Sequence, residues 1–126
     1  MSSVKENKEE QIRLEVRRFF SETLMSLYAS EGVPEHERTP RRQKEVVMKH
    51  YEEISARFFD DMFYRLARIN WELPLLIEEV KKMGPNPSPL ELMRLVCADE
   101  PRHQAMISEY RSCMTLLLEG ADIPSV

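Results

Sequence analysis

Apolar residues recur at three- and four-residue spacing along most of the chain, which is the period of an amphipathic helix. The first such stripe predicts a helix from Glu9 to about Ser30. Acidic residues near its start suit the positive end of a helix dipole, and Gly32 and Pro34 follow as exit signals. The stripe consists of Ile12, Val16, Phe19, Phe20, Thr23, Leu24, Leu27 and Tyr28.

The stretch from residue 39 to residue 84 predicts the central element of the fold. Thr39 and Pro40 form a helix start, with a capping side chain followed by proline at the first helical position. An apolar stripe then continues for six turns to Ile69, so one long helix is expected. Pro74 cannot lie inside an undisturbed helix, which places a break at residues 70–73 and a short helix before Gly84.

Two further helices follow the proline-containing loop at residues 85–87. Ser88 and Glu91 have the spacing of a capping box and predict the start of the first. The second starts at residues 99–101 and ends at Gly120. No alternation of period two persists, so no strand is expected.

These elements predict an all-α protein, a single-domain bundle of about five helices with a long central helix. The domain spans residues 1–126, with a flexible leader at 1–8 and a flexible tail at 121–126. These patterns are too generic to indicate a family.

Composition narrows the class of protein. The chain is 42% hydrophobic and 32% charged with a net charge of −4, which is typical of a folded helical protein and gives no field that attracts nucleic acid or anionic membrane. Cys97 and Cys113 are the only cysteines and are expected to be reduced core residues. No secretory signal and no apolar run of about 18 residues is present, so we expect an intracellular protein, cytoplasmic or nuclear, without a membrane partner.

Large apolar residues occur in adjacent pairs and triplets, and one helical stripe cannot bury every member of each run. They serve either a tight multilayer core or an exposed groove or dimer face. The second alternative predicts a non-catalytic interaction module (an adaptor, assembly factor or regulatory subunit) that binds another protein or a second copy of itself. The expected partner-binding residues are Phe20, Phe59, Phe63, Trp71, Leu75 and Leu76.

A basic cluster offers an alternative function, binding of nucleic acid by a regulator. It consists of Arg38, Arg41, Arg42 and Lys44, with Lys49 and Arg17–Arg18 as further members. Glutamates surround the cluster, and the chain as a whole is acidic, so a solvated and compensated helix face is the simpler interpretation.

A metal-binding bundle is the third hypothesis. Glu100 and His103 have the Glu-x-x-His spacing used in di-metal bundles, but the motif occurs once and would need further carboxylates such as Glu52 or Glu53. Because Glu100 lies at a helix start, capping explains it as well. No cofactor is expected.

The remaining candidates for catalysis are weak, and the chain is expected not to be an enzyme. Asp60 and Asp61 point about 100° apart on a helix, so we expect Asp61 to pair with Arg57 or Arg65. The histidines at positions 36 and 103 are expected in solvent, with the one at position 50 turned partly outward. No glycine-rich phosphate loop or local nucleophile–histidine pair occurs.

Overall fold

A computed structural model of the chain describes residues 7–124, so the predictions for residues 1–6 and 125–126 lie outside the described part. These residues form six α-helices and one short 3₁₀ turn, and none of them belongs to a strand. The elements are α1 (Lys8–Glu31), η2 (Glu35–Glu37), α2 (Pro40–Lys49), α3 (Tyr51–Asn70), α4 (Leu73–Lys82), α5 (Pro89–Cys97) and α6 (Glu100–Leu118).

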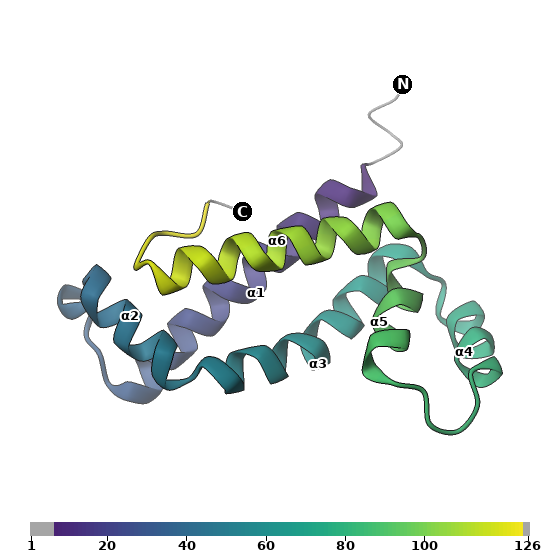
Figure 1. Cartoon of the computed structure of the whole chain (residues 1–126), viewed down its shortest axis with the longest axis horizontal. Helices are drawn as coiled ribbons and strands as arrows, with labels where there is room; N and C mark the ends of the chain where they lie inside the picture. The colour runs from purple at the N-terminus through teal and green to yellow at the C-terminus, as the bar shows by residue number, and fades with distance from the viewer. Residues whose placement is uncertain (1–6, 125–126) are drawn as a thin grey trace.

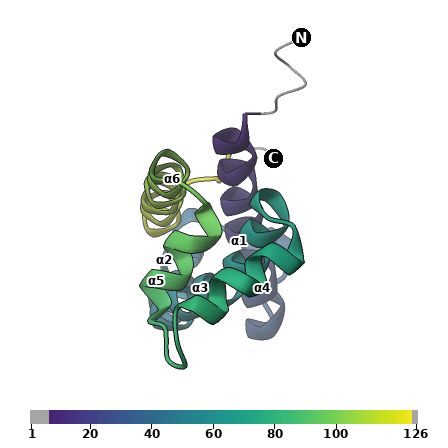
Figure 2. The same ribbon diagram turned by 90° about the vertical axis from the view of Figure 1, so that its right-hand side faces the viewer.

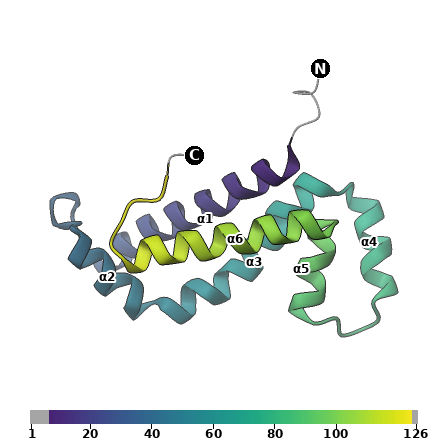
Figure 3. The same ribbon diagram turned by 45° about the horizontal axis from the view of Figure 1, so that its top comes forward.

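The three longest helices, α1, α3 and α6, run along the long axis of the molecule (Figure 1). Helix α1 packs mainly against α6 and then against α3. Helix α2 lies at one end, whereas α4 and α5 lie at the other, where α5 contacts both α3 and α6 (Figures 1 and 2). Helix α4 contacts chiefly α3 and stands at the edge of the bundle (Figure 3).

The single long helix expected from residue 40 to residue 70 is divided into α2 and α3 at His50. The prediction of five helices is therefore too low by one, and the longest helix is α1 with 24 residues. At His50 the backbone leaves helical geometry (φ −111°, ψ 19°), although its N–H still donates to the carbonyl of Val46. No proline or glycine marks this break. Contacts of the His50 side chain with α1, described below, accompany it.

Most of the predicted helix ends are confirmed. Thr39 caps α2, accepting a hydrogen bond from the backbone N–H of the third residue after it, and Gly32 closes α1 in the left-handed conformation. Ser88 and Glu91 form the complete capping box of α5. Trp71 is extended between α3 and α4, as the proline in the following helix predicted. Local sequence therefore determines where most helices begin and end.

The core contains a group of aromatic rings between α1, α3 and α6. Phe19 contacts the ring of Phe58 edge-on at 5.3 Å between centroids, and Tyr110 lies 4.5 Å from the same ring. Both cysteines are fully buried free thiols, which confirms their prediction as core residues. Burial raises the pKa of Cys97 and of Cys113 to about 12, so neither is a reactive thiolate at neutral pH.

Residues 121–124, expected as part of a flexible tail, pack against the bundle. The side-chain amide of Gln43 donates to the carbonyls of Leu117 and Ala121, and Ile123 packs against the core. Gly120 makes this turn possible with φ +75°, and a Cβ added there would lie 2.6 Å from the carbonyl oxygen of Pro40. The end of α6 is thereby fastened to the start of α2.

Candidate functional site

The structure separates the predicted partner-binding residues into buried and accessible ones. Phe20 and Leu76 are buried in the core, which is a correction, because neither offers surface to a partner. Phe59 and Leu75 are 44% and 57% exposed. Phe63 is half-buried.

Trp71, also half-buried, has a structural role. Its indole N–H donates to the carbonyl of Leu95 at 3.0 Å, and its ring packs against the core. This bond ties the α3–α4 connection to α5. Replacing Trp71 would therefore change the fold as well as any surface, so the residue is a poor test of binding.

Two adjoining apolar hollows form a groove between α3, α5 and α6, at the end of the molecule where α5 lies. We call it the α5 groove. Each hollow has a volume of about 300 Å³, and the two share Phe59 and Met93. The inner hollow is lined by Phe58, Phe59, Leu90, Met93, His103, Met106, Ile107 and Tyr110. The outer hollow is lined by Phe59, Asp60, Phe63, Tyr64, Pro89, Leu92 and Met93.

The floor of the α5 groove is continuous with the aromatic core. Phe58 lies 6.3 Å from Phe59 and 4.5 Å from Tyr110, measured between ring centroids. The hydroxyl of Tyr110 lies 3.1 Å from the hydroxyl of Ser55, so its polar atom has a partner. A packed floor with an exposed Phe59 and Leu90 above it is a preformed apolar surface.

His103 is the polar group of the inner hollow, and its burial corrects the expectation that it lies in solvent. Its residue exposure is 2%, and neither ring nitrogen has a hydrogen-bond partner. The nearest carboxylate oxygen, on Glu100, lies 3.9 Å from Nδ1, which is too long for a hydrogen bond. Burial lowers the pKa of His103, so its imidazole is neutral near pH 7.

The sequence singled out His103 only as half of a metal motif and missed its burial in an apolar hollow, although a signal was present. Met106, Ile107 and Tyr110 follow position 103 at three, four and seven residues, which is the spacing of one helical face. Position 103 therefore extends the apolar stripe of α6 towards the start of the helix. A histidine on such a stripe faces the core side of the helix. Leu90 and Met93 were missed for another reason, because only the tertiary packing of α5 places them opposite α3.

One acidic residue of α3, Asp60, lines the α5 groove, and Asp61 follows it in the chain. Asp60 and Asp61 are exposed, and within residues 7–124 neither carboxylate has an ion pair or a side-chain hydrogen bond. The expected pair between Asp61 and an arginine is wrong, because Arg57 contacts Glu53 and Arg65 contacts α1. Of the two, only Asp60 lines the outer hollow, so one unpaired carboxylate borders it.

The predicted basic cluster is compensated internally. Arg41 and Arg42 both contact Glu45, at 3.7 and 3.2 Å. Arg38 donates to the carbonyl of Val33 and lies over the ring of Tyr28, 4.9 Å from its centroid. Lys44 is exposed. Most of the positive charge of this cluster is thus directed at neighbouring groups of the same chain.

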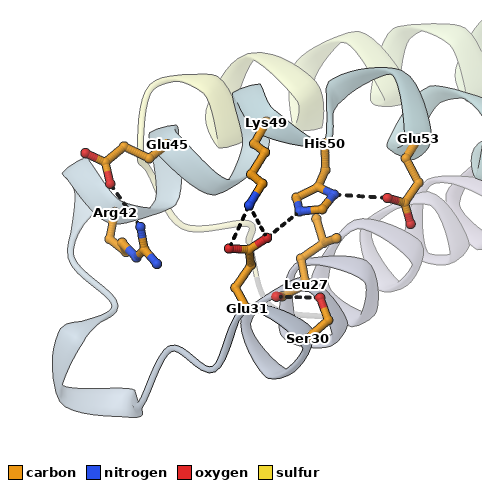
Figure 4. A network of polar contacts seen from close by, with 8 residues as sticks. All are labelled: Leu27, Ser30, Glu31, Arg42, Glu45, Lys49, His50 and Glu53. Atoms are coloured by element: carbon orange, nitrogen blue, oxygen red, sulfur yellow. Dashed lines mark hydrogen bonds and ion pairs between the residues drawn. The ribbon is translucent and has the colours of Figure 1, made fainter.

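A charged cluster fastens the α2–α3 junction to the end of α1 (Figure 4). His50 lies between two carboxylates, with Nε2 2.9 Å from Glu31 and Nδ1 3.0 Å from Glu53. Lys49 also contacts Glu31 at 2.9 Å. Because carboxylates only accept hydrogen bonds, both contacts are satisfied by the doubly protonated ring, which raises the pKa of His50. The same bonds lower the pKa of Glu31 to about 2.

The histidine clusters do not converge as metal ligands. The two carboxylates beside His50 bind opposite nitrogens of the ring, so they face away from a common point. Across residues 7–124, no group of three or more His, Cys, Asp or Glu side chains is placed to hold a metal ion. The further carboxylates that the Glu100–His103 motif would need, such as Glu52 or Glu53, are therefore not arranged around it.

In the described part of the chain, no helix is both long enough and apolar enough to cross a membrane.

Comparison with known proteins adds no assignment. No protein-family model matches the chain, and neither a curated protein nor a solved structure was found to match it.

Proposed function

We propose that this protein is a non-catalytic protein-interaction module, and that its partner binds in the α5 groove. The observation that carries the proposal is the pair of adjoining apolar hollows, bordered by an exposed Phe59 and Leu90. Aromatic and aliphatic side chains at the centre of a groove supply most of the free energy of a typical protein interface. The packed aromatic floor means that this surface is preorganised before a partner binds.

The partner segment that fits best is an amphipathic helix with basic residues beside its apolar anchors. Two neighbouring hollows suit two anchor side chains about one helical turn apart. The carboxylate of Asp60 lines the outer hollow, has no ion pair or side-chain hydrogen bond within residues 7–124, and would attract lysine or arginine at the rim. Such rim charges act mainly on the association rate and on its dependence on salt.

Co-purification of tagged variants from the native host tests the groove. Leu90→Asp is the primary variant, because residue 90 lies in the first turn of α5, where the helix dipole tolerates an acid. Phe59→Asp is the second. Both are expected to lose a partner that the wild type retains in stoichiometric amount, while circular dichroism shows unchanged helix content. Met48→Asp is the matched control, because Met48 is 63% exposed at the other end of the molecule.

The results separate the possible occupants. Retention of the partner by Leu90→Asp and Phe59→Asp would contradict the proposal. Light scattering of the purified chain identifies a second copy, because a wild-type dimer that becomes monomeric in Leu90→Asp places another copy of this chain in the groove. For a basic helix, Asp60→Asn is expected to weaken binding about 3-fold at low salt and less at high salt.

A further inference from the structure

The buried histidine of the inner hollow specifies the chemistry of the group that enters it. We infer that the inner hollow receives an aromatic side chain with a single hydrogen-bond donor, tyrosine or tryptophan, whose donor bonds to a ring nitrogen of His103. This inference rests on the proposed function, since it names the anchor residue of the partner helix. It is carried by the unpartnered imidazole, together with the size and lining of the hollow.

The size and lining favour an aromatic group. A cavity of about 150 Å³ lined by apolar side chains holds benzene, and the inner hollow has about 300 Å³. A ring that carries a polar substituent or a second fused ring therefore fits. The rings of Phe58 and Tyr110 and the thioethers of Met93 and Met106 line the hollow, and these groups make favourable contacts with aromatic rings.

The hydrogen-bonding capacity of His103 favours a donor. A neutral imidazole has one donor nitrogen and one acceptor nitrogen. Glu100 is the carboxylate nearest to the ring, and its oxygens already accept hydrogen bonds from Arg94 and Gln104. Because a carboxylate accepts and does not donate, Glu100 could serve only the donor nitrogen of the ring. The acceptor nitrogen needs an N–H or O–H group from the ligand.

A small adjustment of the hollow must accompany binding. Both ring nitrogens are covered from solvent, although His103 is one of the residues that line the hollow. Met93 and Met106 belong to the same wall, and the unbranched side chain of methionine changes rotamer readily. The proposed bond requires side chains of this wall to move far enough for a donor to reach the imidazole. The methyl groups of both methionines are therefore natural reporters of binding.

Matched pairs of small probes test the inference on the purified full chain, without the partner. The probes are p-cresol against 4-methylanisole, and indole against N-methylindole, so that in each pair a methyl group replaces the donor hydrogen. Binding is followed by NMR, from the methyl signals of Met93 and Met106. The ratio of donor-probe affinity to donor-free-probe affinity is expected to be about 5-fold higher in the wild type than in His103→Leu, which is the effect of one net hydrogen bond.

The His103→Leu variant supplies the control. It keeps the apolar volume and removes the acceptor, so the affinity ratio of donor probes to donor-free probes is expected to fall about 5-fold, while the donor-free probes still bind. In the wild type, p-cresol is expected to shift the ring nitrogen signals of His103 and to leave those of His50 unchanged. This second measurement needs no variant and keeps the inference testable if His103→Leu fails to fold.

The inference and the proposed function can fail separately. Absence of saturable shifts at Met93 and Met106, or an equal preference for the donor probes in the wild type and in His103→Leu, overturns the inference and leaves the groove as a docking surface. Retention of the partner by Leu90→Asp overturns the docking proposal, whatever the probes show. A preference for donor probes that His103→Leu removes, with unchanged signals of His50, supports the inference.

Discussion

His50 and His103 lie in opposite settings in one small bundle. His50 sits at the α2–α3 junction, partly exposed, with a carboxylate on each ring nitrogen. His103 lies in the wall of the α5 groove, 2% exposed, with no hydrogen-bond partner on either nitrogen. The first environment favours the charged ring and raises its pKa, whereas the second favours the neutral ring and lowers it.

The difference separates a structural role from a candidate binding role. The hydrogen-bonding capacity of His50 is consumed inside the chain, where it fastens α1 to the α2–α3 junction (Figure 4). The capacity of His103 is not used within residues 7–124, and a buried polar group without a partner costs about 1–3 kcal/mol. A group that costs stability beside an apolar hollow is a better candidate for ligand recognition than one that stabilises the fold.

The largest effect is expected at the floor of the α5 groove. Phe58→Ala removes a ring that contacts Phe19 and Tyr110, and should lower the free energy of unfolding by about 3–5 kcal/mol. Urea denaturation measures this loss. Met48→Ala, an exposed position near the His50 junction, should change the value by less than about 0.5 kcal/mol. A loss below about 1 kcal/mol for Phe58→Ala would show that the floor is not packed core.

The next effect concerns the opposite end, where Gly120 turns the chain against α2. Gly120→Ala combines a positive φ with a Cβ only 2.6 Å from the backbone oxygen of Pro40, and should cost about 2–3 kcal/mol. Gly84→Ala is the matched control, because Gly84 also has a positive φ but no atom lies within 4 Å of its added Cβ. Its cost should be about 1 kcal/mol. Equal losses in the two variants would mean that the contact with Pro40 contributes nothing.

Replacement of each histidine by leucine tests the comparison directly. His103→Leu removes two unsatisfied nitrogens and should raise the free energy of unfolding by about 1 kcal/mol. His50→Leu removes two hydrogen bonds at a partly exposed site and should lower it by about 1 kcal/mol. Thermal and urea denaturation at pH 7 give both values. Destabilisation by His103→Leu would show that the imidazole has an internal partner.

The smallest effect is the pH dependence of stability, which should have opposite signs for the two histidines. Below the ordinary pKa of 6.5, the unfolded chain protonates position 103 before the folded chain does, so His103 makes stability fall as pH decreases. Above 6.5, the unfolded chain deprotonates position 50 first, so His50 makes stability fall as pH rises towards its folded pKa.

Urea titrations between pH 5.5 and 8 separate the two contributions. His103→Leu should make the free energy of unfolding depend less on pH at the acidic end of this range than in the wild type. His50→Leu should make it depend less on pH at the alkaline end. If His103→Leu changed the alkaline end and His50→Leu the acidic end, the environments assigned to the two histidines would be contradicted. The lowest pH of this range lies above most of the titration of Glu31, whose pKa in the folded chain is about 2.

Local sequence predicted helix boundaries well because capping is a contact between near neighbours. Thr39, Ser88 and Gly32 act within one helical turn of the ends they define, so their chemistry is visible in the chain itself. The break at His50 was missed because the contact that joins this residue to α1 is with Glu31, 19 residues earlier. The interaction that accompanies it joins two helices and leaves no local signal.

The candidate site was predicted only in part, for a related reason. The apolar excess indicated a surface that includes Phe59, but periodicity cannot tell which of two adjacent apolar residues is covered by another helix. Phe19 and Phe20 are both buried, because α1 packs against α3 and α6. Phe59 stays exposed beside its buried neighbour Phe58, because α5 and α6 leave a groove there.

The sequence by itself determined the helical class and most helix ends, because these depend on periodicity and on contacts within a few residues. The tertiary structure decided the division at His50, the burial of His103 and the identity of the groove-lining residues. These features depend on how α1, α3, α5 and α6 pack, since burial and hydrogen bonding between helices set the protonation and the accessibility of each side chain.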